Sequence, residues 1–328
     1  MVYMRYRLEI KHTPIILEIN IVRPLHSFRN FTVQKPPLLT YLKLIFVALF
    51  WGGTFIAGHI VAKEIPHMIA AAGRFLVACV LLLLLAWRME GGLPKLNRQQ
   101  IHATFALGAT GIFLYNICFF AALERMPAGR SALFVALNPI VTALAMALLF
   151  SEKLGFKKWL GIMIAFVGAA IVITRGDLMG AVQDISRSVG AGELFMFTGV
   201  CAWAAYTILG RHALKGLSPI AATTYASLWG LLLLSAGALT QLPQLDRSHL
   251  TMPVLAAIAY LGIFGTVVGF VWYYEGVKKI GPARTAVFNN LVPVFGISFS
   301  ALMLGEPILL SMVIGGLLVI AGVSLTNR

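Results

Sequence analysis

The chain has 328 residues, of which 59% are hydrophobic and 12% charged, and its mean hydropathy is +0.87. This composition excludes an ordinary soluble domain and is typical of a membrane protein, in which a span of about 20 apolar residues crosses roughly 30 Å of hydrocarbon. The formal net charge of +14 comes from Lys and Arg residues scattered between apolar runs, which argues against a nucleic-acid-binding patch and predicts a role in membrane topology.

The first 40 residues differ from the rest of the chain. They alternate charged residues with short apolar pieces and lack the continuous apolar region and small-residue cleavage site of a signal peptide. We predict that residues 1–40 form a cytoplasmic tail or are an upstream extension from a misplaced start. A small interfacial segment is the third alternative.

From residue 41 onward, long uncharged runs predict ten membrane helices. The longest connection, 176–190, is polar and contains glycine, so we interpret it as a linker between two halves, 41–175 and 191–326. The predicted spans are 41–62, 67–89, 101–122, 128–150, 157–175, 191–212, 218–240, 251–274, 282–304 and 308–326.

The Lys and Arg residues predict the orientation of these spans, because cytoplasmic loops retain basic residues. With the N-terminus inside, nineteen of them lie on the cytoplasmic side and six on the outer side, while Arg74 lies within a span. The asymmetry remains when the first 37 residues are left out. Both termini are therefore predicted to be cytoplasmic.

The two halves repeat one another. An offset of 154 residues aligns spans three to five with spans eight to ten, and an offset of 152 aligns "WGGTFIAGHIVAK" with "WAAYTILGRHALK" in the first spans. Because each half holds five spans, the second half is predicted to be inverted, as in many secondary transporters. Pairs matched at offset 154 include Gly108/Gly262, Gly111/Gly265, Arg130/Arg284, Phe134/Phe288, Pro139/Pro293, Glu152/Glu306, Gly161/Gly315 and Gly168/Gly322.

The fourth span of each half carries a central proline, Pro139 or Pro293. A proline lacks the N–H group that a continuing helix needs, so we predict that both act as hinges. Asn138 in one half, and Asn289 and Asn290 in the other, lie beside these breaks and predict a substrate site near the midplane. The alternative is that the prolines only curve the helices and the asparagines join neighbouring helices.

Aromatic and polar residues recur one helical turn apart in the first span of each half, and they lie away from the headgroup belt. They pack in the core or form the wall of a binding site. If spans one, four, six and nine enclose a central cavity, its predicted lining is Trp51, Thr54, Phe134, Asn138, Trp203, Tyr206, Phe288, Asn289 and Asn290.

Three charged residues stand out. Arg74 lies about two turns into the second span, where a charge needs a partner or water. We predict that it contacts an anionic or carboxylate group of the substrate or belongs to an outer gate; the alternative is that it snorkels to the interface. Its second-half counterpart would lie near Ser227. Glu152 and Glu306 precede the fifth span of each half, where we predict structural contacts with exposed helix N–H groups.

In these features the chain resembles the EamA family of the drug/metabolite transporter superfamily, as two tandem five-helix units over about residues 41–326. The most specific pieces are "LGEPILLSMVIGGLLVIAGV" at 304–323 and, more weakly, "FSEKLGFKKWLGIMIAFVGA" at 150–169. The resemblance implies a ten-helix carrier, usually in a bacterial inner membrane, that exports amino acids, related metabolites or toxic small molecules. The halves have diverged, since Ser151-Glu152-Lys153 stands opposite Gly305-Glu306-Pro307.

We therefore expect an all-α membrane protein with ten helices in two inverted repeats, working as a secondary transporter by alternating access. Its expected partners are the bilayer and a small-molecule substrate, with protons as a candidate coupling ion. We expect no nucleic acid, metal or other cofactor. The chain contains no G-x-x-x-x-G-K-[ST] motif for binding ATP.

Other functions remain open at this point. A flippase for lipid-linked groups would fit the same scaffold. An intramembrane enzyme fits less well, because the spans hold almost no acidic residue away from their ends. A structural membrane subunit is a further alternative. The sequence leaves open the substrate, the direction and coupling of transport, and the oligomeric state.

Overall fold

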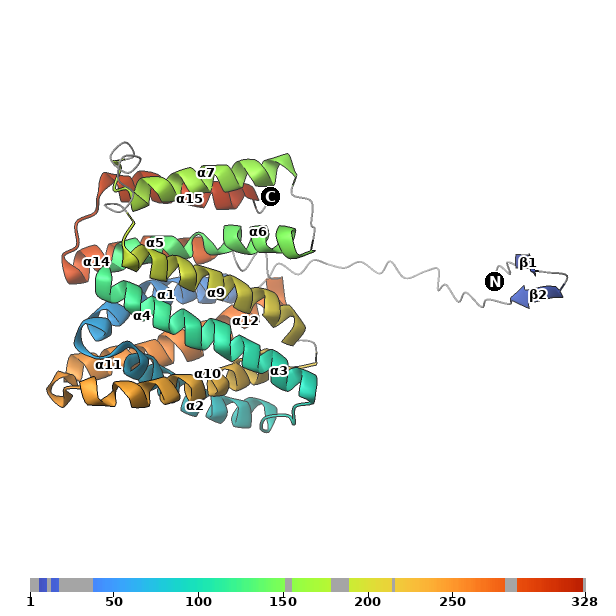
Figure 1. Cartoon of the computed structure of the whole chain (residues 1–328), viewed down its shortest axis with the longest axis horizontal. Coiled ribbons are helices and arrows are strands. Elements are labelled where there is room, and N and C mark those ends of the chain that lie inside the picture. Colours follow the sequence, from blue (N-terminus) through green and yellow to red (C-terminus); the bar gives the residue numbers. More distant parts are fainter. Residues whose placement is uncertain are drawn as a thin grey trace. The chain divides into compact units, whose positions relative to one another are not determined.

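The computed structural model describes residues 6–10, 13–17, 38–150, 155–177, 189–213, 216–280 and 288–326 (Figure 1). The chain divides into two units, 1–35 and 36–328, which are described separately. In the first unit, β1 (Tyr6–Ile10) and β2 (Thr13–Leu17) pair antiparallel, with Tyr6 opposite Leu17. The sequence analysis did not predict this hairpin in the N-terminal segment.

In the second unit, the first half of the chain is helical over most of its described residues. Its elements are α1 (Leu38–Glu64), α2 (His67–Glu90), α3 (Arg98–Leu107), η1 (Gly108–Leu114), α4 (Tyr115–Arg125), α5 (Ala128–Val135), α6 (Asn138–Phe150) and α7 (Phe156–Ile173). The segment α3–η1–α4 runs without a break, and its central part η1 is a π-helix. Residue Glu152 lies outside the described residues.

The second half follows the same plan. Its elements are α9 (Ala191–Ala213), α10 (Pro219–Gln241), η3 (Leu242–Gln244), η4 (Arg247–His249), α11 (Met252–Tyr260), η5 (Leu261–Val268), α12 (Gly269–Ile280), η6 (Phe288–Asn290), α14 (Leu291–Leu304) and α15 (Leu310–Thr326). Here η3, η4 and η6 are short 3₁₀ turns and η5 is a second π-helix.

Several helix ends follow from local sequence. Before α3, the side chain of Asn97 accepts a hydrogen bond from the N–H of Gln100, and the side chain of Gln100 accepts one from the N–H of Asn97, which forms a capping box. The Ser218 hydroxyl caps α10, whose first residue is Pro219. After α2, Gly91 adopts φ +71°, a left-handed conformation that glycine tolerates best.

Seven helical segments among the described residues are long and apolar enough to cross a membrane. They are Leu38–Glu64, His67–Glu90, Arg98–Arg125, Phe156–Ile173, Ala191–Gly210, Pro219–Gln244 and Met252–Tyr273. Two shorter apolar segments, Phe288–Leu304 and Leu310–Leu325, occupy the last two predicted spans. The fold of the second unit is thus that of a multi-helix membrane protein.

The span that contains Pro139 is interrupted near its middle, and the described part of the span that contains Pro293 begins with a 3₁₀ turn at 288–290. Between α5 and α6 the helix gives way to a turn at Ala136 and Leu137, and Pro139 lies in the first turn of α6. Pro293 likewise lies in the first turn of α14, directly after the 3₁₀ turn η6. For Pro139 the alternative that proline merely curves a continuous helix is wrong, because Pro139 lies in the first turn of a new helix, where its missing N–H has no helical partner to lose.

The two π-helices occupy matched positions, since an offset of 154 places η1 on η5. In both, a glycine allows another helix to approach closely. A Cβ on Gly108 would lie 2.7 Å from the carbonyl oxygen of Ala226 in α10, and one on Gly262 would lie 2.9 Å from that of Arg74 in α2. This confirms that these glycines serve packing, and it places Ala226 opposite Arg74 in the repeat.

Helices α7 and α15 cross through matched glycines and lie side by side at the edge of the bundle (Figure 1). A Cβ on Gly168 would lie 2.6 Å from the carbonyl oxygen of Gly315, and one on Gly322 would lie 2.5 Å from that of Gly161. Adding the repeat offset of 154 to Gly168 gives Gly322, and subtracting it from Gly315 gives Gly161, so the two contacts are equivalent in the repeat. The two helices are therefore antiparallel and are related by a local two-fold axis.

The helical bundle has two ends. At the Glu64 end α1 ends and α2 begins, and at the Glu90 end α2 ends. At the Glu64 end, the Glu306 carboxylate accepts hydrogen bonds from the N–H groups of Ala128 and Gly129, at 2.8 and 3.1 Å. Glu306 thus caps α5, in the other half of the chain, and not the fifth span that follows it in sequence. This capping satisfies N–H groups that α5 cannot satisfy itself.

A buried ion pair lies beside this cap. Arg130 Nη1 is 2.8 Å from Glu193 Oε1, and the two side chains are only 7% and 8% exposed. Arg130 also donates from Nη2 to the carbonyl oxygen of Ile173, while Glu193 accepts from the N–H of Gly190 at 2.9 Å. The pair therefore joins α5, α7 and α9 at the Glu64 end.

Replacing only one member of this ion pair should lower the free energy of unfolding strongly. We expect Glu193→Gln to cost about 3–5 kcal/mol, because it leaves the buried Arg130 guanidinium without its counter-charge. Replacing both partners by apolar residues, as in Arg130→Met with Glu193→Leu, should recover much of this loss. Thermal unfolding of the purified protein in detergent measures both effects.

A matched control is Glu64→Gln, since the pair of Glu64 with His249 is 42% and 47% exposed. An exposed pair contributes at most about 1 kcal/mol, so this variant should unfold close to the wild-type temperature. Equal shifts for Glu193→Gln and Glu64→Gln would contradict the importance of the buried pair.

Candidate functional site

A cavity of about 50 Å³ lies inside the bundle, where the two interrupted spans meet the first spans of both halves. Six of the ten substrate-binding residues predicted from the sequence line it: Trp51, Thr54, Arg74, Asn138, Trp203 and Asn289. The sequence did not predict the remaining lining residues, which are Phe55, Tyr115, Phe119, Val135, Gly265, Phe270 and Val292. Spans three and eight therefore contribute to this cavity alongside spans one, two, four, six and nine, which carry the predicted residues.

The other four predicted residues lie off this cavity. Phe134 is 4% exposed and packs against α7 and α15, and the Phe288 ring lies 6.0 Å from that of Tyr41. Tyr206 packs on the π-helix at Gly111, with its ring 5.2 Å from Trp203. Asn290 is 6% exposed but does not line the cavity. An aromatic residue next to a broken helix can face either side of it, which sequence spacing alone does not decide.

Arg74 is held inside the bundle and is only 6% exposed. Its Nε donates to the Thr266 hydroxyl at 3.1 Å, and its Nη1 donates to the Asn116 side-chain oxygen at 3.0 Å. Each of these partners is fixed in turn: the Asn116 amide donates to the carbonyl of Ile112 at 2.7 Å, and the Thr266 hydroxyl donates to that of Leu261 at 3.0 Å. The alternative that Arg74 snorkels to the interface is wrong.

The partners of Arg74 are neutral. Within the described part of the chain, no Asp or Glu lies within ion-pair distance of its guanidinium. Its Nη2 atom lies near Gly265, where a Cβ would be 3.6 Å from Nη2 and 2.7 Å from the Thr54 methyl group. Arg74, Gly265 and Thr54 all line the cavity. Because a charge is costly inside a membrane, the site has the electrostatics of an anion-binding pocket.

This charge is present in only one half. The close contacts of Gly262 with Arg74 and of Gly108 with Ala226 make Ala226 the counterpart of Arg74, one residue before the position suggested from the sequence, Ser227. The cavity is therefore electrically asymmetric although its backbone follows the repeat.

The asparagines beside the two breaks carry unused hydrogen-bonding capacity. The side-chain oxygens of Asn138 and Asn290 are buried and lack a hydrogen-bond partner among the described residues. A buried acceptor without a partner costs about 1–3 kcal/mol, and natural proteins retain such groups where a ligand or water completes them. Asn138 is also one of the residues that line the cavity.

Aromatic rings form the rest of the wall. Trp51 donates from Nε1 to the carbonyl of Gly265 at 3.0 Å, and its ring lies edge-on to that of Trp203, with centroids 6.4 Å apart. The Phe270 ring stacks on Trp203 at 5.8 Å and 16°. The Thr54 hydroxyl donates to the carbonyl of Trp51 at 2.6 Å, so it is already used within α1. The cavity is thus apolar and aromatic with a few polar groups, as small-molecule sites generally are.

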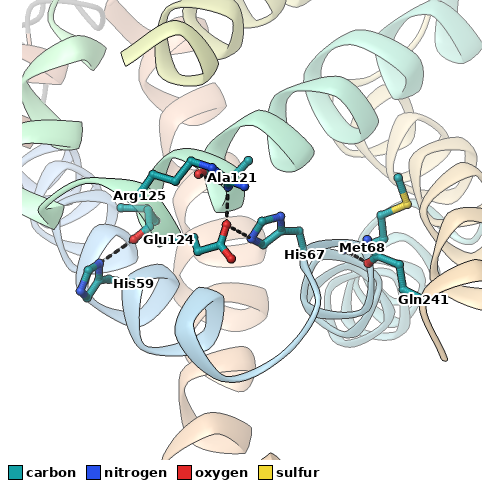
Figure 2. Close-up of polar contacts among 8 residues, drawn as sticks. His59, His67, Met68, Ala121, Glu124, Arg125 and Gln241 are labelled. Carbon is teal, nitrogen blue, oxygen red and sulfur yellow. Dashed lines mark hydrogen bonds and ion pairs between the residues drawn. The ribbon is translucent and has the colours of Figure 1, made fainter. Parts of the chain in front are cut away.

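At the Glu64 end, polar contacts join side chains of neighbouring helices (Figure 2). His59 Nδ1 lies 2.7 Å from the carbonyl oxygen of Leu123, and His67 Nε2 lies 3.3 Å from a carboxylate oxygen of Glu124. The Met68 N–H donates to the Gln241 side chain at 2.9 Å. These contacts tie α1 and α2 to α4 and α10.

Sequence reasoning missed Asn116 and Thr266, which position Arg74. Asn116 was a visible signal, because it is a polar residue in the middle of the third predicted span. Thr266 gave no signal, since threonine is common in membrane helices. Its role depends on η5, where the π-helical turn lets its hydroxyl reach the carbonyl five residues earlier.

Comparison with known proteins agrees with this architecture. The chain is 34% identical over 285 residues to the Bacillus subtilis protein named "Uncharacterized transporter YyaM", covering 86% of this chain and 92% of that protein. It is 26% identical to the "Probable amino-acid metabolite efflux pump" of Salmonella typhimurium, over 85% of this chain and 91% of that one. One solved crystal structure shares the fold, with a TM-score of 0.60 at 17% identity, over 88% of this chain and 96% of the other.

The model of the EamA-like transporter family matches the chain twice, at residues 38–174 and 190–328. These two matches cover both halves of the helical unit and both interrupted spans. The chain is therefore a membrane transporter that belongs to the EamA family.

Proposed function

We propose that the protein exports amino acids, related metabolites or small amphipathic drugs, by alternating access around the cavity at Arg74. The observation that carries this proposal is the buried guanidinium without an acidic partner among the described residues. A solute carboxylate would supply the missing counter-charge, since a guanidinium binds carboxylates through paired N–H donors. The export of an amino-acid metabolite is also the function printed in the name of the Salmonella relative.

The starts of helices α6 and α14 support the binding of an anionic group of the solute at this site. Helices α6 and α14 both begin beside the cavity, which Asn138, Asn289 and Val292 line. The N-terminus of a helix carries a partial positive charge, and half-helices in transporters use it to bind anionic groups. The aromatic wall around Trp51 and Trp203 would bind the apolar part of the solute.

The size of the cavity favours a small solute over a lipid-linked group. A flippase must hold a bulky headgroup, whereas this cavity measures about 50 Å³ and is bounded by aromatic rings. An amino acid can be accommodated by a modest opening of these rings, which a large headgroup would have to displace entirely.

We propose ten membrane spans in two inverted repeats, 41–175 and 191–326, with a linker at 176–190, residues 1–40 as a tail or extension, and both termini cytoplasmic. The antiparallel crossing of α7 with α15 supports the inversion, because the fifth spans of the two halves run in opposite directions. The Lys and Arg excess supports the orientation, and a bacterial inner membrane follows from the family resemblance. The Glu64 end is then external and the Glu90 end cytoplasmic.

This orientation describes a carrier closed to the outside. The buried pair of Arg130 and Glu193 and the Glu306 cap join helices at the proposed external end, whereas a cavity of about 240 Å³, bounded by α2, α10 and α12, lies at the proposed cytoplasmic end. Solute would load from the cytoplasm, and opening the external contacts would release it. Protons remain a candidate coupling ion, and facilitated diffusion is the alternative.

Labelling of single cysteines tests the orientation. In a cysteine-free background, a cysteine at the exposed position Gln244 should react with an impermeant maleimide added to intact cells, and one at the exposed position Gln99 should react only after the membrane is opened. Both are loop or helix-end positions at opposite ends of the bundle. Reaction at Gln99 from outside would overturn the orientation.

Substitution of Arg74 tests the binding role. In liposomes, Arg74→Ala should lower the affinity for a transported amino acid about 10- to 150-fold, since a hydrogen bond to a charged group contributes about 1.5–3 kcal/mol. Arg74→Lys should restore transport only in part, because a point charge replaces a planar fork. The matched control is Arg88→Ala on the same helix, where the guanidinium lies over the Trp87 ring. Equal transport by all variants would exclude the proposal.

Substitution of Pro139 tests the hinge. Alanine supplies the N–H that lets the helix continue through Ala136 and Leu137, so Pro139→Ala should slow turnover and leave substrate affinity nearly unchanged. Turnover and half-saturation of transport in liposomes separate these effects. Pro253→Ala is the matched control, because Pro253 occupies the first turn of the uninterrupted α11. A loss of affinity without a loss of turnover would assign Pro139 to the binding surface.

A further inference from the structure

A second, larger cavity lies at the Glu90 end. It measures about 240 Å³ and is bounded by the C-terminal half of α2, the first turns of α10 and the helix α12. A bulk water occupies about 30 Å³, so the space suits a small organic solute. Its apolar wall includes Leu82, Met89 and Phe270.

The polar groups of this cavity are hydrogen-bond acceptors that are only partly used. The Glu90 Oε2 atom accepts from the Ser218 hydroxyl at 2.7 Å, and the Glu275 Oε2 atom binds Lys43 at 2.8 Å. In each carboxylate the second oxygen, Oε1, has no hydrogen-bond partner in the described part of the chain. Both residues line the cavity.

A buried hydroxyl adds to these acceptors. Thr223 lines the cavity and is 3% exposed, and its Oγ1 lacks a hydrogen-bond partner among the described residues. Within a helix a threonine hydroxyl usually bonds to the carbonyl four residues earlier, as Thr224 does with Ile220 at 2.7 Å. The Thr223 hydroxyl does not form this bond, so a buried polar group without a partner among the described residues lies at the wall of the larger cavity.

These groups match the chemistry of a primary ammonium. An ammonium group has three N–H donors and no acceptor, and the cavity offers two carboxylate oxygens and one hydroxyl. Lys43 neutralises Glu275, and Lys279 lies 3.8 Å from the same oxygen. Glu90 has no Lys, Arg or His within ion-pair distance in the described part of the chain, so we assign it the negative charge that attracts the ammonium. This charge stands out in a chain with 26 basic and 12 acidic residues.

The two cavities are neighbours. Phe270 lines both of them, and its ring stacks on Trp203 at 5.8 Å, so a single aromatic layer separates them. Resting on the function proposed above, we infer that the larger cavity is a loading site that binds the ammonium group of an amphipathic solute before its carboxylate reaches Arg74. Substrates would then be zwitterionic amphipathic compounds, recognised at opposite poles in two successive sites.

Protection of a cysteine from alkylation tests the loading site. The reporter is Ile220→Cys, at a position lining the larger cavity, in the full chain with Cys79, Cys118 and Cys201 replaced by alanine. The probes are 2-phenylethylamine and 3-phenylpropionate, which share an aromatic ring and carry opposite charges. We expect the amine to slow modification by N-ethylmaleimide and the carboxylate to have little effect.

Variants identify the groups responsible. Glu90→Gln keeps the hydrogen bond to Ser218 and removes the charge, so it should raise the amine concentration for half-protection at least tenfold. Thr223→Val removes only the hydroxyl and should raise the amine concentration for half-protection several-fold. Glu64→Gln, at the other end of the bundle, should leave the amine concentration for half-protection unchanged. Equal protection by both probes, or an unchanged response in Glu90→Gln, would overturn the loading site.

A second reporter separates this inference from the proposed function. Val135→Cys lines the smaller cavity, where 3-phenylpropionate should protect through Arg74. Protection at Val135→Cys without protection by the amine at Ile220→Cys would overturn the loading site and leave the proposed function standing. Protection by the amine at Ile220→Cys without protection by 3-phenylpropionate at Val135→Cys would support the loading site and overturn the role of Arg74.

Discussion

Backbone hydrogen bonding in hydrocarbon is the constraint on which the rest of this structure depends. A membrane offers no water to an unpaired N–H or C=O group, so irregular backbone is tolerated only where protein surrounds it. The interruptions at Ala136 and Leu137 and at η6 are placed accordingly, inside the bundle and next to the central cavity. The polar groups that a solute needs are therefore concentrated where helices end, and most of the remaining surface is apolar.

The same constraint explains the contacts between halves. Helix α5 begins at Ala128 with N–H groups that lack helical partners, and a carboxylate from the other half, Glu306, satisfies two of them. The start of α5 is therefore capped by a residue of the other half of the chain, and separating the two halves here would remove the partners of these N–H groups. The neighbouring pair of Arg130 and Glu193 adds a charged contact across α5 and α9. A carrier that works by moving one half against the other would have its outer contacts in this region.

Repetition and asymmetry serve different purposes in this chain. The backbone keeps the repeat closely, through the matched π-helices and the reciprocal glycine contacts of α7 and α15. The charged side chains do not: Arg74 stands opposite Ala226. In the alternating-access mechanism that we propose, a symmetric backbone would allow two equivalent closed states, while the single guanidinium of Arg74 gives the cavity one polarity. The carboxylates of the larger cavity lie on the other side of Phe270, so the two poles of a zwitterion would meet opposite charges in turn.

Composition, periodicity and motifs in the sequence were sufficient to predict the membrane class, the approximate positions of the helices over their described parts, the repeat, the helix break at Pro139 and the family. These features depend on local composition and on periodicity, which a linear sequence records. Only the tertiary structure decided that Arg74 points inward, that Thr54 is used within its own helix, that Phe134 and Phe288 face away from the cavity, and that Glu306 caps α5. It also revealed Asn116, Thr266 and the larger cavity. Each of these depends on the rotation of a helix about its axis, and the contacts of Arg74 and Glu306 also depend on partners more than 40 residues away. Apolar spans buried on several sides carry no periodic signal that fixes that rotation.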